Sequence, residues 1–186
     1  MSENSDKYQR AVQNFSAVVD AVPSDKWDAA SPCEGWTARH VIGHVIGGMQ
    51  VISAVQTGVE AEFGDPLAAA GDDPATNYTA ARDLALESLT EENLAQSVDG
   101  PGGGKMPLDQ LIGMILANDV LIHTWDLAKA TGGDATLDPE LCEAALQGLE
   151  PMDAMVRSAG VFGAKVDAPA DADVQTKLIC FTGRRP

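Results

Sequence analysis

The sequence has few aromatic residues and few positive charges. Of its 186 residues, 5% are aromatic, and 12 Lys and Arg stand against 28 Asp and Glu, which gives a formal net charge of −16. A surface of this sign repels the phosphates of nucleic acids and the headgroups of anionic membranes. We therefore expect neither nucleic acid nor membrane as a partner.

Cysteine is scarce as well. The three cysteines, Cys33, Cys142 and Cys180, are odd in number and show no C-x-x-C spacing, so we expect a reducing compartment and no disulfide scaffold. The first ten residues lack the apolar core of a signal peptide. The most apolar stretch, residues 41–55, is interrupted by polar residues and glycines and is too short to cross a bilayer. These absences predict a cytoplasmic protein.

Apolar residues recur mostly at helical spacing, which predicts an all-α protein. The long helices are expected at about 5–22, 37–57, 74–89, 107–131 and 138–158. Shorter helices are expected at 91–96 and 174–181, and surface loops at 60–74, 99–105 and 160–173. The length suits one domain. We expect a single domain over 1–186, with a four-helix bundle at about 5–132 and a C-terminal helix and tail at about 138–186.

Two polar residues continue the core-facing stripe of the helix expected over 107–131. Asp119 and His123 are four residues apart, which is about one helical turn, so they point the same way. A carboxylate buried without a partner is costly. A bound cation or a buried Asp–His hydrogen bond must therefore compensate Asp119, and the sequence leaves both open.

His44 lies on the apolar stripe of the helix expected over 37–57. Gly47 and Gly48 follow it and would let a neighbouring helix approach closely, so His44 can face the Asp119–His123 pair. Two imidazoles and a carboxylate suit Zn²⁺, Ni²⁺ or Fe²⁺ better than Ca²⁺ or Mg²⁺. Three protein ligands leave a coordination position open, as in catalytic zinc sites. The predicted metal ligands are His44, Asp119 and His123.

Three neighbouring side chains have less definite roles. His40 lies one turn before His44 and is a reserve ligand, although a solvent-exposed position is expected for it. Asp126 either orients an imidazole or is a surface or loop-anchoring carboxylate. Cys33 is expected to be structural, because no histidine is placed beside it.

Two sequence runs carry a resemblance to a known family. The run S-P-C-E-G-W-T-A-R-H-V-I-G-H-V-I-G, residues 31–47, resembles the signature of the N-terminal metal-binding domain of mycothiol-dependent maleylpyruvate isomerase, within the DinB-like superfamily. The run H-T-W-D-L-A-K-A-T-G, residues 123–132, is similar to the second signature, and residues 178–186 resemble small actinobacterial members.

The resemblance implies a DinB-like four-helix bundle with a divalent metal, zinc or nickel, held by His44, Asp119 and His123. It also implies a low-molecular-weight thiol such as mycothiol as partner. The isomerase has glutamate where Asp119 stands, and we expect this chain to be too short for the isomerase's separate C-terminal domain. A metal- and thiol-dependent transferase or isomerase is thus one hypothesis. A non-catalytic metal-binding or regulatory module and a plain helical bundle or homodimer are the others.

Overall fold

The structure is a computed structural model that describes residues 2–58, 63–100, 103–158 and 160–186. The chain divides into two compact units, Met1–Ala135 and Thr136–Pro186. Helices dominate both units, which confirms the expected all-α class and the DinB-like fold.

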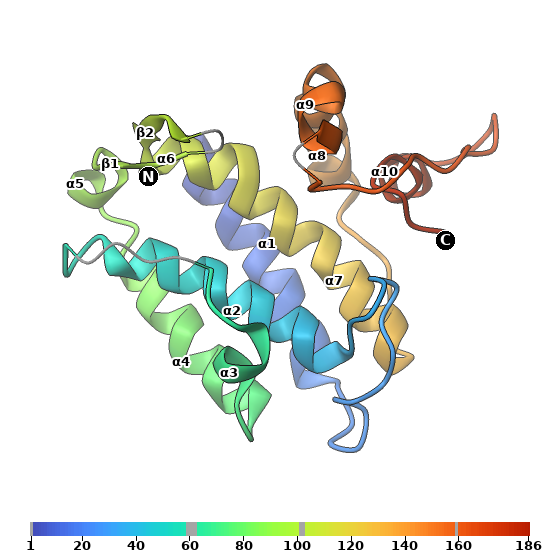
Figure 1. The fold of residues 1–186 in the computed structure, drawn as a ribbon, viewed down its shortest axis with the longest axis horizontal. Helices are drawn as coiled ribbons and strands as arrows, with labels where there is room; N and C mark the ends of the chain where they lie inside the picture. The colour runs from blue at the N-terminus through green and yellow to red at the C-terminus, as the bar shows by residue number, and fades with distance from the viewer. Residues whose placement is uncertain (1, 59–62, 101–102, 159) are drawn as a thin grey trace. The chain divides into compact units, whose positions relative to one another are not determined.

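Four helical segments build the first unit. They are α1 (Glu3–Asp20), α2 (Ala38–Ala54), α4 (Pro74–Glu87) and a continuous run made of α6 (Leu108–Leu111), the π-helical turn η2 (Ile112–Leu116) and α7 (Ala117–Thr131). Figure 1 shows α1 beside α7 and α2 between α4 and α7, and the helices of each of these pairs contact each other. This arrangement lets α1, α2 and α7 each face the interior of the bundle.

The apolar side chains follow the helical period that the sequence predicts. On α1 the buried face repeats every three or four residues and comprises Tyr8, Ala11, Val12, Phe15 and Val19. Thr37 is the N-cap of α2, and α7 ends at Gly132, whose φ of 77° is the left-handed conformation that favours glycine at a helix end.

The π-helical turn η2 changes which side of the helical run at residues 108–131 faces the core. Ile115, which the sequence pattern assigns to the buried stripe, is half-buried, and Leu116 is buried in its place. An extra residue in one turn rotates the following residues around the helix axis. Residues 108–131 are also long and apolar enough to span a membrane, but 72% of that window is buried inside the protein, as in the core helix of a bundle.

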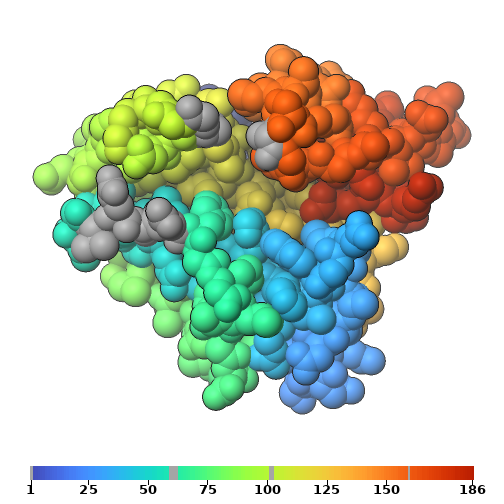
Figure 2. Space-filling view, viewed as in Figure 1, coloured from blue at the N-terminus to red at the C-terminus, as the bar shows by residue number. Residues whose placement is uncertain are grey.

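Two regions predicted as loops contain regular structure. The segment before α4 holds a short helix, α3 (Pro66–Ala70), which begins at the N-cap Asp65. A Cβ at Gly43 would lie 1.8 Å from the Pro66 carbonyl oxygen, so only glycine lets α3 lie this close to α2. Figure 2 shows the α3 segment, in teal to green, on the surface of the first unit.

The predicted glycine-rich turn is part of an antiparallel hairpin, with β1 (Ser97–Asp99) paired to β2 (Lys105–Pro107). Residues 101–102 lie outside the described part. The short helix α5 (Glu91–Leu94) precedes the hairpin and has Thr90 as its N-cap, as predicted.

The second unit contains α8 (Pro139–Leu149), the single turn η3 (Glu150–Met152), α9 (Asp153–Ser158) and α10 (Val174–Phe181). The sequence predicts one helix over 138–158, but Pro151 lies in η3, where the helix changes its winding. The helix α10 packs on α8 and has the predicted bounds. The two remaining cysteines, Cys142 and Cys180, are buried in this unit as free thiols.

Candidate metal centre

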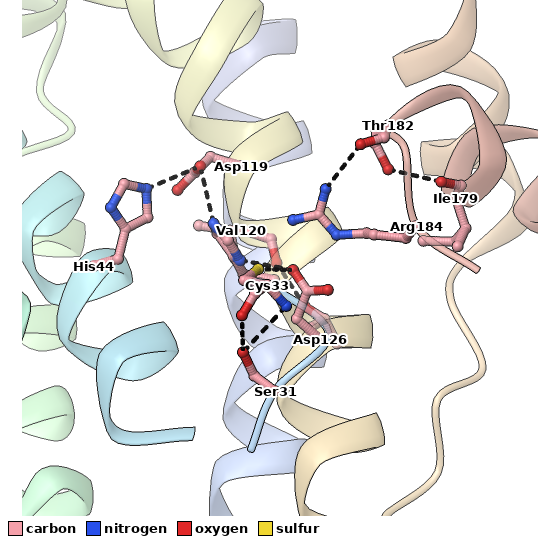
Figure 3. Close-up of polar contacts among 11 residues, drawn as sticks. Ser31, Cys33, His44, Asp119, Val120, Asp126, Ile179, Thr182 and Arg184 are labelled. Atoms are coloured by element: carbon pink, nitrogen blue, oxygen red, sulfur yellow. Dashed lines mark hydrogen bonds and ion pairs between the residues drawn. The ribbon is translucent and has the colours of Figure 1, made fainter. Parts of the chain in front are cut away.

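Three predicted ligands from two helices converge on one point. His44 comes from α2, and Asp119 and His123 come from α7. Asp119 Oδ1 lies 3.2 Å from His44 Nε2 and 3.4 Å from His123 Nε2. The three donor atoms all lie within 4.8 Å of one another. Figure 3 shows His44 and Asp119 pointing toward each other across the space between their helices.

These separations suit a tetrahedral metal ion. With bonds of about 2.0–2.1 Å, two ligand atoms of tetrahedral zinc lie about 3.3–3.4 Å apart. The two Oδ1–Nε2 distances are close to that separation. The same distances also permit hydrogen bonds between carboxylate and imidazole, so a proton and a metal ion can compete for this place.

The three side chains are not closed off from solvent to the same degree. The His123 side chain is 9% exposed, whereas His44 and Asp119 are 25% and 23% exposed. The centre is therefore anchored in the core by His123 and open on the side of His44 and Asp119. An ion or a small ligand can reach it without unfolding the bundle.

Asp126 fixes the orientation of the His123 ring. Its Oδ2 accepts a hydrogen bond of 2.9 Å from His123 Nδ1, and its side chain is fully buried. A proton on Nδ1 leaves Nε2 as the nitrogen that faces Asp119. Of the two roles that the sequence left open for Asp126, the geometry favours the orienting one, which is the usual second partner of a metal-binding histidine.

Cys33 lies beside this pair, contrary to the sequence-based expectation. Its Sγ lies 3.3 Å from Asp126 Oδ2, and Cys33, His123 and Asp126 form a second group of donor atoms within 4.8 Å (Figure 3). A histidine does therefore stand next to this thiol. The sequence reasoning missed it because residues 31–36 form a loop, whose path helical periodicity does not predict.

Charges and hydrogen bonds couple the ionisation of Asp119 to that of His123. Burial alone lowers the pKa of His123, but the charge of Asp119 and the hydrogen bonds that the imidazole donates to Asp119 and Asp126 raise it well above its ordinary value. Burial alone raises the pKa of Asp119, but the charge of His123 and the hydrogen bonds from both imidazoles hold it well below the ordinary range. Without a metal, a carboxylate anion therefore faces a protonated imidazole.

Aromatic rings surround the imidazoles. The Trp36 ring lies 5.3 Å from the His44 ring and 5.9 Å from the His123 ring, between centroids. Phe63 stacks on the His44 ring, with the ring centroids 5.1 Å apart, and is 45% exposed. Gly47 and Gly48 leave room for the Phe63 ring, and Gly48 also leaves room for the Leu116 side chain of η2. No helical pattern in the sequence points to Phe63, because it lies in the loop after α2.

His40 is not part of the group of three. Its Nδ1 accepts a hydrogen bond of 3.2 Å from the backbone N–H of Thr37, which closes the first turn of α2, and its ring stacks near Trp36. It is half-buried, not fully exposed. Trp125 is buried at 2% exposure and packs in the core, with the Lys129 ammonium over its ring.

The helical bundle of the first unit is consistent with the DinB-like class of proteins. The chain belongs to the mycothiol maleylpyruvate isomerase N-terminal domain family, whose sequence profile matches residues 8–128. Two Mycobacterium tuberculosis relatives, uncharacterized proteins Rv0738 and MT0763, are each 32% identical over 190 residues, which covers 95% of this chain and 95% of theirs.

Solved structures agree on the fold. The mycothiol-dependent maleylpyruvate isomerase superposes with a TM-score of 0.59 at 20% identity, and a variant of it with a TM-score of 0.62 at 17% identity. Each match covers 91% of this chain and 77% of the isomerase chain. At this identity the likeness establishes the fold and not the activity.

Proposed function

We propose that this protein binds a divalent metal ion through His44, Asp119 and His123 and uses the site to bind a low-molecular-weight thiol such as mycothiol. The observation that carries the proposal is the meeting of three donor atoms, within 4.8 Å, from two helices. Two imidazoles and one carboxylate favour zinc, and they also accept nickel.

Three further side chains support the metal site in different ways. Asp126 holds the proton on His123 Nδ1 and so keeps Nε2 free for the ion. Trp36 and Phe63 flank the imidazoles with apolar surface and limit the access of water from those sides. The partial exposure of His44 and Asp119 leaves one approach open for a ligand.

A divalent ion at this place would favour the thiolate form of a bound thiol, which is the nucleophilic form. Membership of the family supports a thiol as the partner, because the solved relatives are mycothiol-dependent. A transferase or isomerase activity is the enzymatic form of the proposal. In that form the substrate pocket would open toward the loop at residues 31–36.

Metal content tests the proposal first. The protein is purified without chelator, and its zinc and nickel are measured against protein concentration. We expect about one ion per chain in the wild type and in His40→Ala, whose imidazole serves the helix cap. His44→Ala and His123→Ala should lose the ion while keeping the helical circular dichroism spectrum. A wild type that holds no ion and takes none up on dialysis contradicts the proposal.

Thiol binding tests the second half. Calorimetric titration of the zinc-loaded protein with mycothiol should show one site, which His44→Ala and chelator treatment both abolish. Thiol-dependent turnover of a maleylpyruvate-type substrate then separates an enzyme from a non-catalytic metal-binding module. Metal uptake without any thiol binding leaves the non-catalytic module. The cytoplasmic location and the homodimer stay predictions of the sequence.

A further inference from the structure

One buried polar group in the described part of the bundle lacks a partner. The hydroxyl of Tyr8, on the buried face of α1, has no hydrogen-bond partner among the described residues. The side chain is 1% exposed. A buried hydroxyl without a partner destabilises the folded state, and such groups in natural proteins call for an explanation.

A second tyrosine in the same bundle shows that the core can satisfy such a group. Tyr78 on α4 is equally buried, at 1% exposure. Its hydroxyl lies 2.8 Å from Ser16 Oγ and 3.3 Å from the backbone carbonyl oxygen of Val12. The two tyrosines thus differ in their partners and not in their burial.

Tyr8 lies on a helix that packs against the helix of the candidate metal centre. Its helix packs along α7, which carries Asp119 and His123. Burial, with the nearby Tyr78 and the negative charge of Asp119, raises the pKa of Tyr8 above its ordinary value, so the group is a neutral phenol that can donate.

One carboxylate oxygen of Asp119, Oδ2, can accept a further hydrogen bond. Both imidazoles contact its Oδ1, and within the described part of the chain no hydrogen bond reaches its Oδ2. Both dashed lines to Asp119 in Figure 3 end on the same oxygen. Two helices that pack together therefore carry a buried donor without an acceptor and, within the described residues, a carboxylate oxygen without a donor.

We infer that Tyr8 is a positioning residue of the metal centre, whose hydroxyl donates through one bound water molecule to Asp119 Oδ2. Direct contact is not made in the structure, and one water bridges polar atoms that are too far apart for a direct bond. The bridge holds Oδ2 away from the imidazoles and keeps Oδ1 turned toward them. This inference rests on the proposed metal site.

The test compares Tyr8→Phe with the matched control Tyr78→Phe. Cobalt(II) replaces zinc as a spectroscopic probe, and its affinity is measured by competition with a chelator. We expect Tyr8→Phe to weaken cobalt binding about 10-fold or more and to shift the visible cobalt spectrum. Tyr78→Phe should leave both within twofold of the wild type. Unchanged cobalt affinity and spectrum in Tyr8→Phe overturn the inference.

A second measurement, on chelator-treated protein, does not depend on metal. If Tyr8 shares a water with Asp119, Tyr8→Phe should lower the thermal midpoint by about 2–4 °C. If the hydroxyl is merely buried and dry, removing it should leave the midpoint unchanged or raise it, which overturns the inference. A wild type that takes up no cobalt overturns the proposed function instead, and the chelator-treated comparison still decides the role of Tyr8.

Discussion

His44 Nε2 and Asp119 Oδ1 lie 3.2 Å apart although 75 residues separate them in the sequence. The contact joins α2 to α7 at a polar point in an otherwise apolar interface. Neither side chain is fully buried, so the pair is open to an ion from solvent. The length of the acidic side chain then decides how well an ion fits.

Asp119→Asn and Asp119→Glu separate the charge of the carboxylate from its reach. In Asp119→Asn the side chain is a neutral amide and no longer an anionic ligand, so we expect cobalt affinity to fall about 100-fold or more. Glutamate keeps the charge but moves the carboxylate by one methylene, and we expect a loss of about tenfold. Equal losses in the two variants, or an amide that binds as tightly as the wild type, would contradict a ligand role for Asp119.

Asp126→Asn tests the orientation of His123. The amide can turn its NH₂ toward Nδ1 and so favour the wrong tautomer of the imidazole. We expect cobalt affinity to fall about 10- to 100-fold without loss of the ion site itself. In a double-mutant cycle, the effect of Asp126→Asn should largely vanish in a His123→Ala background. Additive effects would mean that Asp126 does not act through His123.

Cys33→Ala tests the thiol that sequence reasoning set apart from the site. Loss of the contact between Cys33 Sγ and Asp126 should weaken cobalt affinity by about 2- to 10-fold, the range of one hydrogen bond. Cys33→Ser keeps a donor and should stay close to the wild type. Cys142→Ala, in the second unit, is the control and should not change metal affinity. A loss of 100-fold or more in Cys33→Ala would instead make Cys33 a ligand.

Helical periodicity predicts those parts of the site whose residues lie on helices. The four-residue spacing of Asp119 and His123 puts both on one side of α7, and the stripe of α2 turns His44 toward them. Periodicity does not predict the loop that brings Cys33 and Trp36 to the imidazoles. It also does not predict α3. The contact of α3 with α2 requires that residue 43 has no side chain, and the path of the chain there is set by tertiary packing.

Gly43→Ala tests that close contact. A Cβ at this position would overlap the Pro66 carbonyl oxygen, so α3 must move, and we expect a loss of about 1–3 kcal/mol in the free energy of unfolding. Gly148→Ala, in α8, has no heavy atom within 4 Å of the added carbon and should stabilise by about 0.5–1 kcal/mol. Urea unfolding measures both. A stabilising Gly43→Ala would show that α3 does not pack here.

Metal affinity should keep changing with pH above the range in which an ordinary histidine titrates. The pKa of His123 is raised in the metal-free protein, so its proton stabilises the fold below the unfolded-state pKa of about 6.5, and that contribution is lost as pH rises through the higher folded-state value. An ion must displace this proton. Cobalt affinity should therefore rise about tenfold per pH unit for each proton displaced, and the rise should continue above pH 6.5.

Thermal unfolding with and without cobalt, between pH 6 and pH 8, measures this competition. The midpoint of the chelator-treated protein should change little or fall as pH rises, because the ion pair of Asp119 and His123 weakens. The midpoint of the cobalt-loaded protein should rise over the same interval, so the difference between them grows with pH. His40→Ala should show the same growth, since its imidazole serves the cap of α2. A difference that stays constant with pH would mean that the ion binds elsewhere than at His123.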